Sequence, residues 1–371
     1  MLIGLFPELD APGGVQRAGR HLAAVLTEYA NSRSMECRLL SLNDSPELHR
    51  MSVGNREFEF TGFARKKGQF AAMALRAARR RAKLVLSAHP NLGPVAAGMK
   101  LVANKRLKSI ISTHGIEVWE PLPAIRRRSL RRADLVLAPS RSTAEHVIEQ
   151  QEVAPEKVRV LPWALDPQFE VLLTANVQPA LPPHFPTGRV ILTVGRWEVR
   201  ERYKGMDTLI TVLPRLLPRW PDLQLVIAGD GEDRVWLEHL TERNGVRRHV
   251  RFLAGLSHEA LSACYAACEI FALPSAAEGF GLVYLEAMAR GKPVIGGAHG
   301  GAPEVIEDGK TGYLVPHGDS VQLATSIETL LTHPELGKEM GARGKKRVEE
   351  AFRFNVFAKA FKKILREQCE S

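Results

Sequence analysis

The stretch "SAAEGFGLVYLEAMARGKPVIG" occupies residues 275–296 and combines a loop, a helix and the start of a strand. Residues 282–290 have the composition of a helix, and the Gly-Lys-Pro that follows would end it. Gly279 and Gly281 precede this helix, at a place where glycine lets the backbone approach another group closely. A helix N-terminus presents unpaired N–H groups and a partial positive charge, so we expect an oxygen-rich or anionic ligand there. An ordinary strand-to-helix turn is the alternative interpretation.

Short apolar runs alternate with amphipathic stretches along the whole chain, and this pattern predicts βα units with parallel sheets. The predicted strands form two series, 2–6, 37–42, 83–88, 109–113, 134–139 and 158–162, then 190–195, 224–229, 250–255, 270–274, 293–297 and 312–316. Residues 172–188 contain four prolines and separate the two series as a linker. The predicted fold class is therefore α/β, with two doubly wound parallel sheets that bind ligands at their carboxyl ends, across a cleft.

A chain of 371 residues is long enough for two domains of this kind. We expect an N-terminal domain at 1–170 and a C-terminal domain at 171–354, with a last helix at about 355–371 that packs back on the first domain. The apolar content of 45% and the charged content of 25% are typical of a globular protein. The four cysteines lack disulfide or zinc spacing, and the first residues suit a strand better than a signal peptide, so we expect a cytoplasmic protein.

The net charge of +10 is concentrated in the first half of the chain, where residues 1–160 hold 26 Lys and Arg against 15 Asp and Glu. Two basic runs stand out, "QFAAMALRAARRRAKLVL" at 69–86 and "AIRRRSLRRADLVL" at 124–137. Helical spacing would gather the cations of each run on one face. These are Arg76, Arg79, Arg80 and Lys83 in the first run, and Arg127, Arg128, Arg131 and Arg132 in the second.

The basic runs predict that the N-terminal domain docks on an anionic membrane surface, at the inner face of the cell membrane. Solvated helix faces are the simpler alternative. Nucleic-acid binding is a remote alternative, because the chain has no RNA-binding aromatic motif and no helix-turn-helix signal.

Several other residues lie where a predicted strand ends. Gly13 and Gly14 follow the first strand and open a helix, where backbone could reach a phosphate, although a plain turn fits equally well. Arg196 and Lys204 follow the strand at 190–195 and would suit a diphosphate, or would simply be solvated. His114 ends the strand at 109–113 and is available to the cleft, although a structural role is more common for such a histidine.

Glu278 and Glu286 lie on either side of the Gly-Phe-Gly backbone. Paired carboxylates are typical of acid/base hydrolysis, but they equally suit hydrogen bonds to vicinal hydroxyl groups. A sugar and a ribose that are separated by a diphosphate would offer two such pairs of hydroxyls.

The segment EGFGLVYLE resembles the signature of the retaining glycosyltransferases of family 4. The segments PGGVQRAGRHLA, THGIEVW, RRADLVLAPSRSTAEHV, VGR…YKG, LVIAGDGED and GGAPEVIEDGKTGYLV resemble the same family, in the expected order, from Met1 to about Phe361. The resemblance implies the GT-B fold, two Rossmann-like domains that face each other across a cleft. It also implies transfer of a hexose from a UDP- or GDP-sugar to a glycan or lipid-linked acceptor, in polysaccharide or glycolipid assembly, without a metal or a cofactor.

The resemblance assigns a role to each matching position. It implies catalytic roles for His114, Glu278, Arg196 and Lys204, and acceptor contacts for Gln16 and His114. The implied donor site comprises Gly13, Gly14, Arg196, Lys204, Phe252, Leu253, Glu278, Gly279, Phe280, Gly281, Leu282 and Glu286, with Glu286 at the ribose and Phe252–Leu253 beside the base. One position departs from the family, since Trp163 stands where members often have Asn. This leaves open whether Trp163 alters the cleft as a hydrophobic wall.

The implied mechanism is attack by the acceptor hydroxyl on the face from which the diphosphate leaves, with the leaving group taking the proton. Arg196, Lys204 and helix N-termini would neutralise the diphosphate. A glycoside phosphorylase or a sugar-nucleotide hydrolase on the same scaffold is the alternative. The sugar, the base and the acceptor depend on small differences in the pocket that these motifs do not encode.

Overall fold

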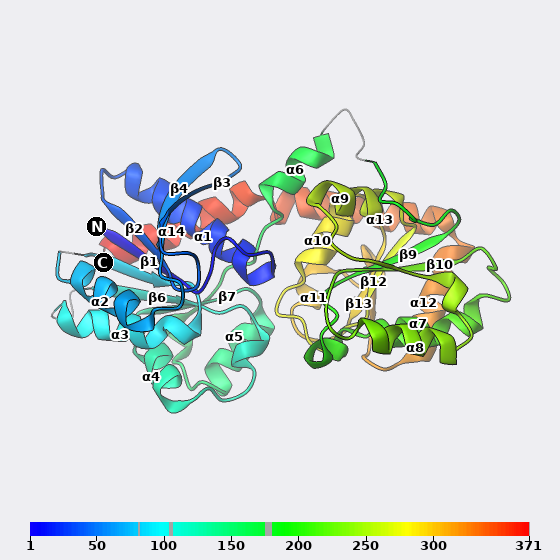
Figure 1. Ribbon diagram of the computed structural model, residues 1–371, viewed down its shortest axis with the longest axis horizontal. Helices are drawn as coiled ribbons and strands as arrows, with labels where there is room; N and C mark the ends of the chain where they lie inside the picture. Colours follow the sequence, from blue (N-terminus) through cyan, green and yellow to red (C-terminus); the bar gives the residue numbers. More distant parts are fainter. Residues whose placement is uncertain (81, 104–106, 175–179, 371) are drawn as a thin grey trace. The chain divides into compact units, whose positions relative to one another are not determined.

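The computed structural model describes the whole chain except residues 81, 104–106, 175–179 and 371 (Figure 1). The chain divides into two compact units, each built on its own sheet. Unit 1 comprises Met1–Gln168 and Phe354–Ser371, and unit 2 comprises Phe169–Arg353. Part of the predicted linker, residues 175–179, lies outside the described residues, and its first residues belong to helix α6 (Pro167–Thr174).

The sheet of unit 1 has the strand order β3-β4-β2-β1-β5-β6-β7-β8. Its strands are β1 (Leu2–Phe6), β2 (Cys37–Ser41), β3 (Leu48–Val53), β4 (Arg56–Gly62), β5 (Leu84–Ser87), β6 (Lys108–Ser112), β7 (Leu135–Ala138) and β8 (Val158–Val160). Neighbouring strands are parallel except β3 and β4, which form an antiparallel hairpin at one edge. Apolar side chains that are buried on both faces of the parallel strands explain why their sequences are continuous apolar runs.

Helices cover both faces of this sheet. They are α1 (Gly14–Asn31), α2 (Lys67–Ala78), α3 (Gly93–Val102), α4 (Ala124–Arg132), α5 (Arg141–Glu149) and α14 (Phe354–Glu370), with 3₁₀ turns η1 (Pro90–Leu92), η2 (Ile116–Val118) and η3 (Pro155–Lys157). In Figure 1, α1 and α14 lie on one face, and α2, α3 and α4 on the other. The C-terminal helix is joined to α1 by an ion pair from Lys362 Nζ to Glu28 Oε1 at 2.8 Å. A second ion pair joins it to the turn after α1, from Arg33 Nη2 to Glu370 Oε1 at 3.1 Å.

A partly buried carboxylate, that of Asp166, fixes the segment that leaves β8. Asp166 lies 3.7 Å from Arg17 Nε and 3.7 Å from Nε2 of His21, both on α1. Burial alone would raise the pKa of Asp166, but His21 and Arg17 hold it well below its ordinary value. His21 also packs against Phe354 of α14, with ring centroids 4.9 Å apart. Asp166 therefore joins this segment to both helices on that face of the sheet.

The sheet of unit 2 is wholly parallel in its described part, with the order β11-β10-β9-β12-β13-β14. Its strands are β9 (Val190–Val194), β10 (Gln224–Ala228), β11 (Val250–Leu253), β12 (Ile270–Leu273), β13 (Val294–Gly297) and β14 (Gly312–Val315). Its helices are α7 (Met206–Leu216), α8 (Arg234–Arg243), α9 (His258–Ala267), α10 (Leu282–Ala289), α11 (Ala302–Val305), α12 (Ser320–Thr332) and α13 (Pro334–Ala351), with 3₁₀ turns η4 (Val199–Lys204) and η5 (Arg247–His249). Figure 1 shows α7, α8 and α12 on one face of the sheet and α9, α10 and α13 on the other.

The strand predictions are confirmed to within two residues at each end, but the hairpin β3–β4 was missed. Outward side chains of β3 are exposed, so this edge strand lacks the apolar run of a buried one. The pair Gly54-Asn55 forms its two-residue turn, with Gly54 at φ 61, and is the signal that could have revealed it.

The prediction of one basic helical face in the first basic run is wrong. Helix α2 ends at Ala78, so Arg79, Arg80 and Lys83 do not share a helical face with Arg76, and residue 81 lies outside the described residues. The second run does form a helix, α4.

Candidate functional site

The order of strands in unit 2 creates a crevice at one point of the sheet. Strands β10 and β11 lie on one side of β9, and β12, β13 and β14 lie on the other. The connections that leave β9 and β12 therefore diverge, and such a switch point is where open α/β sheets bind ligands. The connection after β9 carries Arg196 and Lys204, and the connection after β12 carries Glu278. The topology thus places the predicted diphosphate and sugar residues on the two sides of the switch point.

These two connections pack directly on each other. Gly205 adopts the left-handed conformation (φ 74) between η4 and α7, and a Cβ atom on it would lie 2.7 Å from the carbonyl oxygen of Pro274. The N–H of Ala276 donates to the carbonyl of Tyr203 at 2.8 Å. Lys204 is consequently held beside the loop that carries Glu278.

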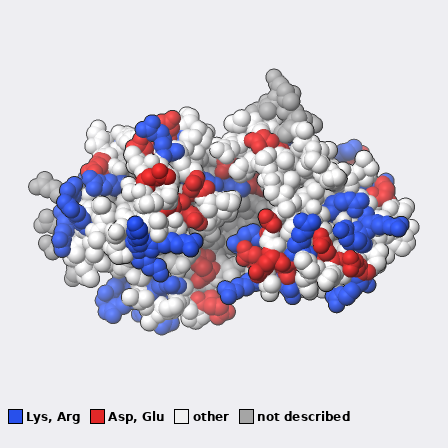
Figure 2. All heavy atoms as spheres, viewed as in Figure 1, with Lys and Arg blue, Asp and Glu red and all other residues white. Residues whose placement is uncertain are grey.

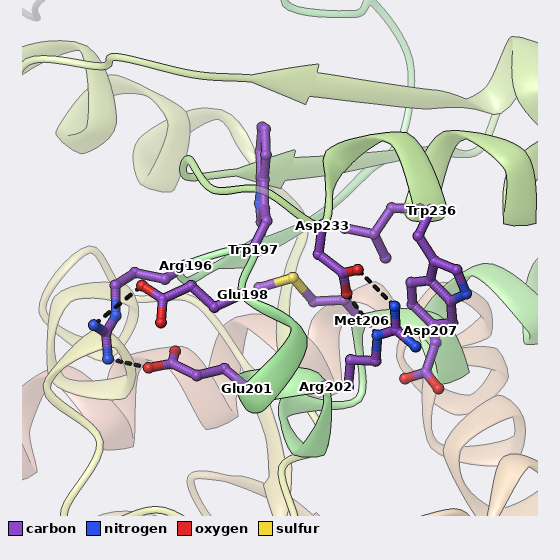
Figure 3. A pocket seen from close by; sticks show the side chains of 10 residues that line it. Arg196, Trp197, Glu198, Glu201, Arg202, Met206, Asp207, Asp233 and Trp236 are labelled. Atoms are coloured by element: carbon purple, nitrogen blue, oxygen red, sulfur yellow. Dashed lines mark hydrogen bonds and ion pairs between the residues drawn. The ribbon is translucent and has the colours of Figure 1, made fainter.

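Arg196 and Lys204 share one carboxylate, that of Glu201 in η4. Figure 3 shows its interaction with Arg196. Arg196 donates to Glu201 and, at 3.3 Å, to Glu198, while Lys204 Nζ lies 2.5 Å from Glu201 Oε2. Glu201 is only 8% exposed, whereas Arg196 is 65% exposed. A nearly buried carboxylate is costly unless it is paired, so Glu201 binds both cations and holds them close together.

A second ion pair holds η4 at the next residue, Arg202. Arg202 donates to both oxygens of Asp233 at 2.7 Å, and its guanidinium carbon lies 3.8 Å from the ring centroid of Trp236 on α8. Figure 3 shows this group on one side of a small cavity and Arg196 with its two glutamates on the other. The neighbouring residues Glu201 and Arg202 thus anchor the middle of η4 on two sides, which restricts the positions of Arg196 and Lys204.

Gly281 and the carbonyl of Glu278 fix the shape of the loop before α10. Gly281 takes a left-handed conformation (φ 92) as the residue before α10, and a Cβ atom on it would lie 2.3 Å from Tyr284 Cδ2. No other residue type fits both the dihedral and the close contact. The carbonyl of Glu278 accepts a hydrogen bond from the N–H of Gly301 at 2.6 Å, which ties the loop to the connection after β13.

Glu278 is a carboxylic acid with an altered proton affinity. Loss of hydration raises its pKa to about 7, with a further upward contribution from Glu201 and an opposing one from Lys204. The side chain therefore changes its charge near neutral pH, between a cation and a second carboxylate.

Glu286 lies in the second turn of α10 and is 2% exposed. Its Oε2 accepts a hydrogen bond from the hydroxyl of Tyr265, on α9, at 2.8 Å. The predicted ribose contact remains a prediction, and Tyr265 is the residue that orients this carboxylate.

Phe252 and Leu253 end β11, as expected for residues beside a base at the sheet's carboxyl edge. The Phe252 ring packs edge-on against Trp197, with centroids 5.7 Å apart. The carbonyl of Leu253 accepts from the N–H of Gly229, so it is engaged in the ladder. Trp197, which follows Arg196 in the chain, therefore borders the predicted base region.

In unit 1 the corresponding switch point lies between β1 and β5. Gly13 (φ 136) and Gly14 begin α1 there. A Cβ atom on Gly13 would lie 2.5 Å from Oε1 of Gln16, and the amide nitrogen of Gln16 donates to Glu8 at 3.3 Å. The predicted acceptor residue Gln16 thus lies folded over the start of the helix.

His114 follows β6 and is held by two hydrogen bonds. The backbone N–H of His114 donates to Oε1 of Glu117 at 2.6 Å, and its ring nitrogen Nε2 lies 2.6 Å from the carbonyl oxygen of Ala88. Because a carbonyl only accepts, Nε2 carries the hydrogen, and in the neutral ring Nδ1 is an acceptor. Nδ1 is buried and has no hydrogen-bond partner among the described residues. The ring can therefore accept a hydrogen bond from a hydroxyl group.

Two rings flank His114. His89 and Trp163 each stack on it with centroids 5.5 Å apart. Burial, His114 and Arg126 lower the pKa of His89 to about 3, so His89 is neutral at pH 7. Trp163 is 4% exposed and packs on His114 and Phe357 of the same unit. A hydrophobic wall on a cleft stays a prediction.

Sequence reasoning missed Glu201, Tyr265 and His89. Glu201 stands in "RWEVRERYKG", where its spacing of three from Lys204 was an available signal. His89 follows β5 as His114 follows β6, so a shared position after neighbouring parallel strands could have paired them. The sequence did not indicate a role for Tyr265, because a tyrosine inside an apolar helix is normally a residue of the hydrophobic core.

The described residues were also compared with the requirements for a membrane-spanning helix and for a metal site. No described helix combines the length and the apolarity that crossing a bilayer requires. Nor does this part of the chain contain a group of three or more His, Cys, Asp or Glu side chains that could hold a metal ion. Independence from metal remains a prediction.

Known families and proteins match this chain along most of its length. Residues 12–169 match Glycosyltransferase Family 4, and residues 179–347 match Glycosyl transferases group 1. The chain is 35% identical over 274 residues, 68% of its length and 67% of the relative's, to a GDP-mannose-dependent alpha-(1-6)-phosphatidylinositol monomannoside mannosyltransferase of Mycolicibacterium smegmatis. It is 31% identical over 283 residues, 70% of each chain, to the GDP-mannose-dependent monoacylated alpha-(1-6)-phosphatidylinositol monomannoside mannosyltransferase of Corynebacterium glutamicum.

Sucrose-phosphate synthase from Thermosynechococcus elongatus has a similar structure, with a TM-score of 0.77 and 21% identity over 99% of this chain and 98% of its own. The chain belongs to glycosyltransferase family 4, within the glycosyl transferases of group 1. Its two Rossmann-like sheets have the GT-B fold. The predicted family and fold class are confirmed.

The raised pKa of Glu278 predicts how stability depends on pH. Between about pH 4.5 and pH 7 the folded chain keeps a proton that the unfolded chain has lost, so Glu278 reduces stability as pH rises through this window. Glu278→Gln removes this effect. Its Tm should therefore rise relative to the wild type by a few degrees between pH 5 and pH 8, as measured by thermal unfolding. The exposed Glu198→Gln serves as control, and a Tm difference that is the same at every pH would contradict the assignment.

Proposed function

We propose that the chain is a retaining hexosyltransferase that moves a mannosyl group from GDP-mannose to a mannosylated phosphatidylinositol lipid. The observation that carries the proposal is the pair Arg196 and Lys204, held by Glu201 beside Glu278 at the switch point of unit 2. The donor and the acceptor are taken from the two relatives, both GDP-mannose-dependent enzymes of phosphatidylinositol mannosides.

In the proposed reaction, the acceptor oxygen forms a bond to C1 of mannose as the bond from C1 to the β-phosphate oxygen breaks on the same face. The hydroxyl proton passes to the leaving phosphate, and the products are an α-mannoside and GDP. Arg196 and Lys204 stabilise the charge that grows on the diphosphate, which is the contribution that accelerates the chemical step. Glu278 receives hydrogen bonds from the sugar, Glu286 from the ribose, and His114 from a hydroxyl through Nδ1.

The product tests this proposal. Incubation with ¹³C-labelled GDP-mannose and vesicles that contain phosphatidylinositol monomannoside should yield a mannoside with the α configuration, measured from the one-bond C–H coupling at C1. Activity should persist in a chelator of divalent ions, because fixed cations replace a metal. A β-linked product, or free mannose as the main product, would overturn the proposal in favour of an inverting enzyme or a hydrolase.

Variants of the cation pair test the diphosphate site. Arg196→Ala and Lys204→Ala should each lower kcat about 100-fold, the scale of removing one preorganised charge-stabilising group. Glu201→Gln should bind GDP several-fold more tightly, because the diphosphate no longer competes with an internal carboxylate. Glu198→Gln is the matched control, since among the described residues its carboxylate pairs with Arg196 but not with Lys204, and it is 41% exposed. GDP affinity is measured by calorimetry, and equal affinity of the Glu201→Gln and wild-type proteins would rule out this competition.

The proposed acceptor is a lipid, and helices α2, α3 and α4 of unit 1 offer a surface for it. We call these three helices the α2–α4 surface. Arg127 and Arg131 pair with Glu152, whereas Arg128 and Arg132 make no ion pair with the described residues. Ile125, one turn before Arg128 on α4, is 68% exposed. Leu101 on α3 and Met73 on α2 are 66% and 41% exposed. Figure 2 shows Lys and Arg gathered at the left and lower left, over α2 and α4.

Exposed apolar side chains among unpaired arginines suit an anionic bilayer, where each basic residue contributes about 1 kcal/mol. The triple variant Ile125→Ser, Arg128→Ser and Arg132→Ser should therefore lose co-sedimentation with anionic vesicles at 0.1 M salt. Wild-type binding should also weaken near 1 M salt, where the Debye length falls to about 3 Å. Lys345→Ser with Lys346→Ser, on α13, is the control. Equal binding to neutral and anionic vesicles, or full binding by the triple variant, would contradict docking through the α2–α4 surface.

A further inference from the structure

The imidazole of His114 stacks on two other rings. Its centroid lies 5.5 Å from that of His89, with 26° between the ring planes, and 5.5 Å from that of Trp163, with 25° between the planes. The hydrogen bond from Nε2 to the carbonyl of Ala88 fixes the direction in which Nε2 points. The two stacked neighbours fix its plane, which a single hydrogen bond leaves free to tilt.

Trp163 is itself supported from behind. Its indole packs against Phe357 of α14, with centroids 5.9 Å apart. On the N-terminal side, the N–H of Leu161 donates to the carbonyl of Ala138 at 2.8 Å. On the C-terminal side, Asp166 is held by α1. The segment that carries Trp163 is therefore anchored at both ends, and the C-terminal helix closes the stack.

We propose that Trp163 is a positioning residue for the glycosyl transfer, which fixes the His114 ring so that Nδ1 faces the hydroxyl it binds. An asparagine at position 163 has no ring to stack on His114. In this chain a series of ring contacts therefore determines the orientation of His114. His89 contacts His114, His114 contacts Trp163, and Trp163 contacts Phe357 of the C-terminal helix. This inference rests on the proposed function, because His114 must meet the sugar or the acceptor for its orientation to affect transfer.

The experiment separates the stack from catalysis. The full chain is labelled with ¹³C at Cε1 of its 12 histidines, and the His114 resonance is assigned as the one lost in His114→Gln. A neighbouring indole face shifts the Cε1–H resonance upfield by its ring current. Trp163→Leu should move this resonance downfield, and Trp163→Phe, which retains a ring, should keep part of the upfield shift.

The same variants are then assayed for transfer. Trp163→Leu should lower kcat about 10- to 100-fold, the scale of a small misplacement of a positioned group, with little change in KM for the nucleotide sugar. Trp163→Phe should recover most of kcat. Trp220→Leu is the matched control, because Trp220 is 7% exposed in the core of unit 2. It should lower Tm but leave kcat and the His114 resonance unchanged, and all assays are run below the lowest Tm.

Two results would overturn the inference. One is a His114 resonance that does not move in Trp163→Leu, which would show that the rings do not stack in solution. The other is a kcat of Trp163→Leu equal to that of Trp220→Leu, which would show that Trp163 only stabilises the fold. If the wild-type protein neither binds GDP-mannose nor forms a mannoside, the proposed function has failed instead, and the resonance still shows whether the stack exists.

Discussion

The reversal of strand order between β9 and β12 is the constraint on which the rest of unit 2 depends. Parallel strands need crossover connections, and a reversal sends consecutive connections to opposite sides. The resulting gap at the carboxyl edge is bordered by the loop with Arg196 and Lys204 and by the loop with Glu278. Gly205 allows these loops to approach, since any side chain there would meet the backbone of Pro274. Unit 1 repeats the arrangement between β1 and β5, with Gly13 and His89 after those strands.

Electrostatic compensation defines the site in unit 2. Arg196 and Lys204 would repel each other if both were held close without a counterion, and Glu201 supplies it. A substrate that brings its own negative charge can take over that role without any rearrangement of the sheet. Glu278 is tuned by the same groups, because Lys204 favours its charged form while loss of hydration and Glu201 oppose it. The cations, the shared carboxylate and the titrating acid therefore act as one coupled group.

In unit 1, aromatic packing holds the candidate site residue His114, whereas in unit 2 ion pairs hold Arg196 and Lys204. His114 has its nitrogen Nε2 committed to Ala88, and its ring lies in a column of His89, Trp163 and Phe357. Phe357 comes from the C-terminal helix, whose ion pairs to α1 and to the turn after it keep it on this unit. The last residues of the chain thus support a residue near its middle.

The sequence by itself determined the family, the two parallel sheets and the loops that carry the site. Buried parallel strands must be short apolar runs, and glycine is required where backbone approaches closely. Both features can be recognised within a single segment of the sequence. Tertiary structure alone decided which charges meet. The spacing of three from Lys204 indicates one partner of Glu201, but it does not show that Glu201 binds two cations. That difference from Glu198 arises because η4 turns the Glu201 carboxylate toward both Arg196 and Lys204 and leaves Glu198 41% exposed. The burial of Trp163 likewise depends on a helix that begins nearly two hundred residues later, since contacts between distant segments have no periodicity to read.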